Sequence, residues 1–412
     1  MNQAMTKTLT HTRMIFFCWQ APSDLSKTNI NQMKNQIVIK ILILILLFIY
    51  SCRDNKPENN LTINVRSEIS STPKELALSD FGAKIEYIKL KPKPDVSFRH
   101  IQKLQLTDKG IYLSDRKGLY LFDFQGEFVN EIGRMGNGPG EHSGNIRFAV
   151  NESAKEIYIY NFLKNIMVYD KETGLFLRDF PVEYNVCEIL VPQPDRIVLF
   201  TWDTDRVVNP YEVIVMDTLG NILAAIANNS RAEIAGNVSA YATAWQYKDI
   251  LRYLYIYSDS LFTIDENFER QIYASLKFEN SVSRSQLSVL PEIVNHPDLL
   301  TVSRVTENEQ YLFLWVQKGI HGGIKQDISY MLFDKHTNNL NKVSQIKNDL
   351  DGGMDFWPHW ISNEIMIDYR HAFELLDYLH ESQKKGIELS SGFLRFASTL
   401  NENDNPVLIM VR

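Results

Sequence analysis

The sequence predicts an all-β protein that folds as a six-bladed β-propeller with four-stranded blades. Three observations support this prediction. Apolar strand-forming segments recur at a regular interval, each interval contains an aspartate followed by a turn, and apolar segments at both ends of the repeated region supply one further blade. The composition is that of a folded globular chain, because 44% of the 412 residues are hydrophobic and 23% are charged.

The period is clearest at five aspartates that end apolar strands. Each is followed within two or three residues by turn-forming Gly or Asn, or by a similar polar turn, and then by a second strand. The first four anchors are nearly evenly spaced, and the longer last interval indicates an insertion. The anchors are Asp123, Asp170, Asp217, Asp265 and Asp334.

Each period contains about four short segments rich in Ile, Val, Leu, Tyr and Phe, which are strand-forming residues. Four strands in 40–50 residues make one propeller blade, and a blade buries both faces only by stacking in a ring. The sixth blade is expected to use both chain ends. Strand 84–90 should therefore pair in the same sheet as Val407–Val411, which would also remove open sheet edges.

Two segments interrupt the β pattern. Residues 283–300 have helical spacing broken by two prolines, and residues 371–400 are more strongly helical. In the second segment, Phe373, Leu376 and Leu379 recur at the spacing of one helix face. We predict small helical insertions in both places, within a propeller domain that spans residues 61–412.

The N-terminal region reads as a targeting signal. Residues 33–51 combine a basic start, a short apolar run and a small residue before Cys52, which is typical of a secretory signal and too short for a membrane span. The Ile-x-Ser-Cys ending resembles a bacterial lipobox, and that resemblance implies cleavage before Cys52 and its lipidation. The alternative is an uncleaved N-terminal anchor. Both readings place the domain outside the cytoplasm.

The flanking segments fit this interpretation. A start at Met33 gives a signal of ordinary length, so residues 1–32 are expected to be an upstream extension from a misassigned start. Residues 52–60 are polar and include Pro57, as in a flexible tether. We expect a protein of the cell envelope, lipid-anchored to a membrane on the periplasmic side or at the cell surface.

Charge and cysteine content exclude several classes of function. The net charge of −7 argues against a nucleic-acid-binding protein, which needs a basic surface. Three cysteines fit neither a metal spacing nor a disulfide framework, and Cys187 is expected to be a lone buried thiol. Neither a nucleophile elbow nor a metalloprotease, EF-hand or P-loop motif occurs. We therefore expect no cofactor, no metal and a monomer.

The glycine-rich segment Gly133–His142 has the composition of a phosphate-binding loop. Such loops act at a helix N-terminus, whereas this one joins two predicted strands. Its glycines are better explained by the backbone angles needed to cross between blades. Glu141, His142 and Arg147 remain candidates for a binding face at the central funnel.

Further candidates for this face are Trp202, Asp203, Trp357 and His359, which fall near predicted loops. Tryptophan offers a flat apolar face for sugars or peptides. The alternatives are turn formation for Asp203 and cover over a blade end for Trp357.

Three segments match a known family. They are FGAKIEYIKL (81–90), LYLFDFQGEFVNEIGRMGNGPGEH (119–142) and ENDNPVLIMV (402–411). With them the chain resembles the six-bladed β-propeller lipoproteins of Bacteroidota, whose blades are similar to NHL repeats. His142 stands where that family usually has tyrosine. The resemblance implies fold and location more than activity.

Two main functions remain open. The leading hypothesis is a membrane-anchored binding or scaffold module for a protein, peptide or glycan. The alternative is a metal-dependent hydrolase or lyase, similar to lactonases or esterases, with its site in the central funnel; a purely structural envelope component is a third option. Convergence of three His, Asp or Glu side chains near the axis would favour the enzyme. An axis lined by Tyr, Trp and Arg would favour binding.

Overall fold

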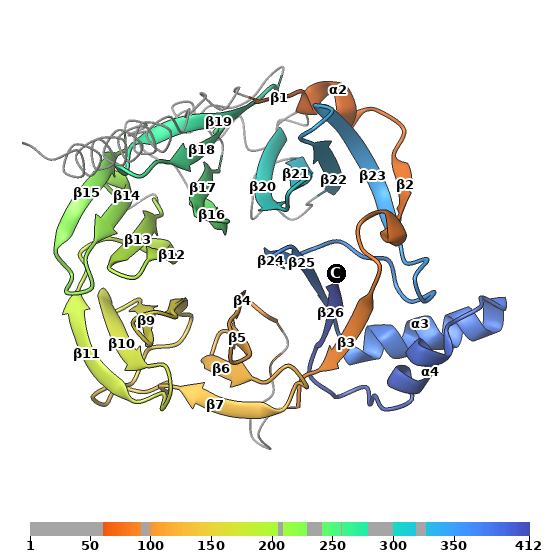
Figure 1. The fold of residues 1–412 in the computed structure, drawn as a ribbon, viewed down its shortest axis with the longest axis horizontal. Coiled ribbons are helices and arrows are strands. Elements are labelled where there is room, and N and C mark those ends of the chain that lie inside the picture. Colours follow the sequence, from red (N-terminus) through yellow and green to blue (C-terminus); the bar gives the residue numbers. More distant parts are fainter. Residues whose placement is uncertain are drawn as a thin grey trace, which may run out of the picture. The chain divides into compact units, whose positions relative to one another are not determined.

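The computed structural model describes residues 61–412 except 92–97, 99, 205–208, 229–240, 257, 279–299 and 319–326. Six sheets are arranged in a ring, each built on four antiparallel strands, with one edge strand of each sheet toward the centre (Figure 1). The predicted six-bladed β-propeller is confirmed. The predicted signal, Cys52, the tether and residues 283–299 of the first insertion lie outside the described residues.

Blades 1 to 3 follow the chain in order from the innermost strand outward. Blade 1 consists of β4 (Lys103–Leu106), β5 (Ile111–Ser114), β6 (Leu119–Phe122) and β7 (Phe128–Ile132). Blade 2 consists of β8 (Arg147–Asn151), β9 (Glu156–Asn161), β10 (Asn165–Asp170) and β11 (Phe176–Pro181). Blade 3 consists of β12 (Val186–Gln193), β13 (Arg196–Thr201), β14 (Tyr211–Met216) and β15 (Ile222–Ala227).

Blades 4 and 5 each gain a fifth strand that the sequence analysis did not predict. Blade 4 consists of β16 (Ala242–Tyr247), β17 (Ile250–Tyr255), β18 (Ser260–Ile264) and β19 (Arg270–Leu276). Blade 5 consists of β20 (Leu300–Glu307), β21 (Tyr311–Lys318), β22 (Asp327–Asp334) and β23 (Asn339–Lys347). β1 (Leu61–Ile63) pairs in parallel with β19, and β2 (Lys74–Ala77) pairs in parallel with β23. Helix α2 (Val65–Ile69) lies between β1 and β2, and the 3-10 helix η1 (Leu78–Asp80) follows β2.

Blade 6 closes the ring with strands from both parts of the chain. Its order is β24 (Trp360–Ser362), β25 (Ile365–Arg370), β26 (Val407–Val411) and β3 (Ile85–Lys89). β26 and β3 pair antiparallel from Val407 opposite Lys89 to Val411 opposite Ile85, as predicted. All five side chains of β26 are buried, so apolar packing as well as backbone hydrogen bonding holds this closure together.

The predicted insertion at 371–400 forms two helices between β25 and β26. They are α3 (Ala372–Lys385) and α4 (Ser391–Ala397). The backbone N–H of His371 donates to Glu374 at 2.8 Å at the start of α3, and Gly386 ends the helix at φ 68°. Phe396 stacks on Tyr87 of β3 at 5.0 Å between ring centroids, which anchors the helices on blade 6. No helix in the described part of the chain is long and apolar enough to cross a membrane.

The aspartate anchors explain why the period is visible in the sequence. Asp123 follows β6, and its Oδ1 accepts hydrogen bonds from the backbone N–H of Gln125 at 2.9 Å and of Glu127 at 2.8 Å. A short acceptor side chain thereby satisfies the donors that the turn leaves unpaired. The same arrangement recurs at Asp170, Asp217, Asp265 and Asp334.

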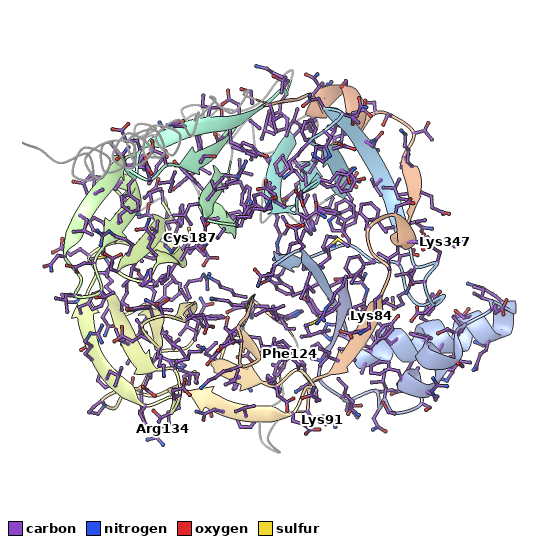
Figure 2. The ribbon with its side chains drawn as sticks, in the orientation of Figure 1. Lys84, Lys91, Phe124, Arg134, Cys187 and Lys347 are labelled. Atoms are coloured by element: carbon purple, nitrogen blue, oxygen red, sulfur yellow. The ribbon has the colours of Figure 1, made fainter. Side chains whose placement is uncertain are left out.

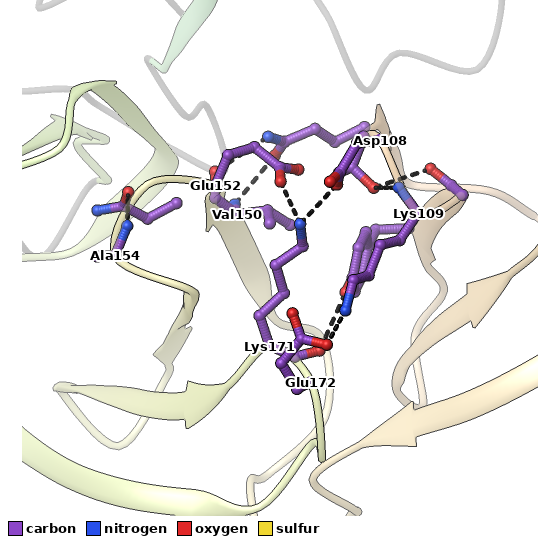
Figure 3. Close-up of polar contacts among 12 residues, drawn as sticks. Asp108, Lys109, Val150, Glu152, Ala154, Lys171 and Glu172 are labelled. Atoms are coloured by element: carbon purple, nitrogen blue, oxygen red, sulfur yellow. Dashed lines mark hydrogen bonds and ion pairs between the residues drawn. The ribbon is translucent and has the colours of Figure 1, made fainter.

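Ion pairs connect neighbouring blades. The ammonium of Lys171, which is 3% exposed, donates to Asp108 of blade 1 at 2.8 Å and to Glu152 of its own blade (Figure 3). Between blades 4 and 5, the fully buried Glu307 accepts from Lys335 at 3.0 Å and pairs with Arg252 at 3.3 Å. Each of these buried charges is therefore matched by an opposite charge, as low-dielectric surroundings require.

The anchoring turn gives a direct test of the repeat. Asp123→Ala removes the acceptor of two backbone N–H groups, and we expect the free energy of unfolding to fall by about 1 kcal/mol in urea titrations. Asp123→Asn keeps an oxygen in the same place and serves as the matched control, with most of the stability retained. An equal fall in the free energy of unfolding of the two variants would show that the charge of Asp123, and not its place in the turn, stabilises the protein.

Candidate ligand-binding site at the propeller axis

The six innermost strands surround the axis and bring charged residues close to it. Strands β4, β8, β12, β16, β20 and β24 each contact the next around the ring. Figure 2 shows Cys187 of β12 on the inner side of its blade, beside the centre. Three of these strands carry a cation, namely Lys103 in β4, Arg147 in β8 and Arg304 in β20.

Two of the three cations are held by the protein itself. The ammonium of Lys103 reaches from blade 1 to blade 3, where it pairs with Glu188 at 2.5 Å and donates to the carbonyl of Ile189 at 2.9 Å. Arg147 donates through Nε to the carbonyl of Cys187 at 2.8 Å and through Nη1 to that of Ile146 at 3.1 Å. These contacts join blades 1, 2 and 3 around the axis.

Arg304 is held differently. Its guanidinium lies 5.4 Å from the ring centroid of Trp315 and 5.3 Å from that of Trp360, in cation–π contact with both. No described residue forms a hydrogen bond or ion pair with it. Burial lowers the pKa of Arg304 to about 10, against the opposing effect of Tyr369 and Glu188. The side chain therefore stays charged at neutral pH.

A histidine oriented by a buried carboxylate lies beside this arginine. His359 Nδ1 is 2.6 Å from Oδ1 of Asp368, whose side chain is fully buried and also pairs with Arg370 at 2.7 Å. The carboxylate fixes the orientation of the imidazole ring and leaves its second nitrogen, Nε2, available for a contact with a ligand. The His359 ring lies 5.6 Å from Trp360 and 5.3 Å from Tyr369.

We call Arg304, Trp315, His359, Trp360 and Tyr369 the axial site. Trp315 lies 5.9 Å from His359, and Trp360 lies 5.8 Å from Tyr369, between ring centroids. The site combines strands of blades 5 and 6, so it depends on how these two blades pack against each other. Its chemistry is a fixed positive charge within aromatic walls, which suits the recognition of an anion.

Three residues of the predicted binding face are buried. His142, Asp203 and Trp357 are at most 5% exposed. Asp203 accepts from the backbone of Asn209 at 2.8 Å and so ties its own loop together. Trp357 packs 4.7 Å from Tyr330, which matches the expected alternative of a cover over a blade. These side chains support the loops in this structure and offer no exposed surface.

The glycine-rich loop is organised by its own residues. Glu141 accepts from the backbone of Gly138 at 2.8 Å and from Arg134 at 2.6 Å, and these contacts lower the pKa of its carboxyl. His142 accepts through Nδ1 from Gly144 at 3.2 Å, and burial lowers the pKa of its imidazole. Gly140 has φ +73°, and a Cβ there would meet Phe176 at 2.7 Å. The loop joins β7 to β8, as the geometric explanation of its glycines requires.

The remaining predicted residues fall into two groups. Arg147 lies 5.9 Å from the ring of Phe162, which packs 6.4 Å from Trp202 in an edge contact. His359 belongs to the axial site, and Trp357 packs beside it, 5.8 Å from Trp315. Arg147 and Trp202 thus share Phe162 as a neighbour, and Trp357 and His359 share Trp315.

Arg304, Trp315, Trp360 and Tyr369 were not selected from the sequence as site residues. Arg304 carried one usable signal, because it is a cation in the middle of β20, an inner strand that also contains Leu300, Val302 and Val305.

Cys187 is free, as expected, but it is only half-buried. Its thiol contacts the carbonyls of Phe200 and Thr201, both at 3.3 Å, and burial raises its pKa to about 12. It is therefore a protonated thiol at neutral pH. Among the residues that the structure describes, no group of three or more His, Cys, Asp or Glu side chains is placed to hold a metal ion.

Fold and site together define a six-bladed propeller with a cationic and aromatic axial site. Residues 60–412 match the family DUF4934, described as a domain of unknown function, and the chain belongs to this family. No curated protein matches the chain.

Solved structures share the fold at low sequence identity. A candidate exported protein of Bacteroides fragilis is 15% identical with a TM-score of 0.65, and the match covers 86% of this chain and 99% of that one. A member of the duf4221 family from Bacteroides vulgatus is 10% identical with a TM-score of 0.48, over 80% and 96% of the two chains. At these identities the likeness extends to the fold alone.

Proposed function

We propose that this protein is a lipid-anchored, NHL-like propeller of the bacterial cell envelope that binds a partner at the axial site. The partner is a protein, peptide or glycan, and binding involves no chemical turnover. The observation that carries the proposal is Arg304, a charged side chain between two indole rings that forms no hydrogen bond with any described residue.

The contrast with other buried charges supports a binding role for Arg304. Lys171, Arg252 and Lys103 each have a carboxylate partner within the protein. Arg304 is half-buried and has no such partner, so its partly desolvated guanidinium carries a cost unless something else supplies the anion. Binding sites retain such costs because the ligand recovers them, whereas structural positions do not.

Capture from the native envelope tests the proposal. The full-length protein and its Arg304→Gln variant are used to recover bound proteins, peptides and glycans, which are quantified by mass spectrometry. We expect at least one partner to be recovered about tenfold less with Arg304→Gln, because a charged hydrogen bond is lost.

Lys117→Gln is the matched control, since it removes one exposed cation from a blade turn and leaves the axial site intact. Recovery of the same partners in the same amounts by wild type and Arg304→Gln would contradict the proposal, provided that both variants melt at similar temperatures.

Membrane anchoring rests on the lipobox-like sequence before Cys52. We expect wild-type protein expressed in its own host to incorporate labelled palmitate and to partition into detergent, because an acylated cysteine adds buried methylene groups to the membrane. Cys52→Ser should abolish both. Cys187→Ser changes the other cysteine of the predicted mature chain, so it is the control and should change neither. Palmitate incorporation that persists in Cys52→Ser would refute lipidation at this residue.

A further inference from the structure

The axial site contains several hydrogen-bonding groups that the described protein leaves without a partner. The guanidinium of Arg304 has five N–H donors. It contacts the rings of Trp315 and Trp360 and forms no hydrogen bond with a described residue. Within the described residues, the Tyr369 hydroxyl, the Trp360 indole N–H and the Nε2 atom of His359 also form no hydrogen bond. Arg304 lies in β20 of blade 5. In blade 6, His359 directly precedes β24, Trp360 begins β24 and Tyr369 lies in β25.

The charges around the axis determine which anion fits. Glu188 is neutralised by Lys103, and Asp368 by Arg370. Arg304 therefore contributes one unmatched positive charge, and both carboxylates raise its pKa through their nearby negative charge. Arg147, in blade 2, also has no carboxylate partner, but its Nε and Nη1 already donate to protein carbonyls. At Arg304, one unmatched charge beside two carboxylates favours a monoanion over a doubly charged phosphate. A guanidinium fork also matches the two oxygens of a carboxylate.

The other groups determine what carries the carboxylate. The Arg304 guanidinium, the Tyr369 hydroxyl and the Trp360 indole N–H are donors, so the site suits a ligand rich in acceptor oxygens. A peptide backbone carries one N–H donor for each carbonyl, whereas a sugar carries only ring oxygens and hydroxyls, which accept as well as donate. The C–H faces of a sugar ring also pack on aromatic side chains such as Trp360 and Tyr369.

We propose that the axial site binds the carboxylate of an acidic sugar, with Arg304 contacting the carboxylate and Tyr369, Trp360 and His359 contacting the sugar oxygens. This inference rests on the proposed binding function and narrows its ligand to a glycan that carries uronic acid units. Arg147 and Lys103 are already held by carbonyl and carboxylate oxygens of the protein and are not needed for it.

The test is calorimetric titration of the full chain in detergent with oligogalacturonate, in which each sugar carries one carboxylate. The matched probe is the same oligomer with its carboxylates methyl-esterified. We expect esterification to weaken binding at least tenfold, because it removes the anion but keeps the ring. Arg304→Gln should abolish the difference between the two probes, and Lys117→Gln should preserve it.

A second variant keeps the test valid if Arg304→Gln does not fold. Tyr369→Phe deletes one hydroxyl with little change in shape, and we expect oligogalacturonate to bind about fivefold more weakly. The inference is overturned if the acidic oligomer does not bind or if the esterified oligomer binds equally well. Equal binding of inorganic phosphate or of a tripeptide with a free C-terminal carboxylate also overturns it.

The two proposals fail separately. If envelope capture depends on Arg304 but oligogalacturonate does not bind, the acidic-sugar inference falls and the binding function stands. If oligogalacturonate binds as described but envelope capture is unchanged by Arg304→Gln, the proposed function falls, while the chemistry of the site is supported.

Discussion

Pairing of β26 with β3 is the constraint on which the rest of this structure depends. The two strands are separated by more than 300 residues of chain, and their backbone ladder completes blade 6 and closes the ring. Every side chain of β26 is buried, and β26 also pairs with β25, the strand next to β24. The pairing thereby completes the blade that carries Trp360 and Tyr369, which form the axial site with Arg304 of blade 5. The fold and the proposed function are linked through this blade.

The charges of the propeller divide into two kinds. Lys171 and Glu307 illustrate the first, in which buried charges at blade junctions meet opposite charges and help to fix one blade against the next. Arg304 illustrates the second, since aromatic rings surround it and no described carboxylate neutralises it. Cation–π contact recovers part of the desolvation cost and leaves the hydrogen-bonding capacity unused. An anionic ligand would use that capacity.

Much of the fold was predictable because its determinants are local. Asp123 and its counterparts stand at fixed places in each blade, since the turn needs a short acceptor there. The parallel strands β1 and β2 were not predictable, because three or four residues without a period carry no signal of a distant partner. The axial site was only partly predictable. His359 was selected from the sequence as a candidate for the binding face, but Arg304 and Tyr369 come together through tertiary packing. His142 was expected to be accessible, and the structure buries it.

If Arg304 is retained for binding, its charge lowers the stability of the ligand-free protein. The free energy of unfolding of Arg304→Met tests this cost most directly. Methionine keeps the apolar packing and removes the uncompensated charge. We predict that Arg304→Met stabilises the ligand-free protein by about 1 kcal/mol in urea unfolding. The comparison is Arg252→Met, which removes one of the two cations that pair with the buried Glu307 and should destabilise by about 3 kcal/mol. A loss of stability in Arg304→Met as large as that in Arg252→Met would contradict the account, because Arg304 would then be a structural residue.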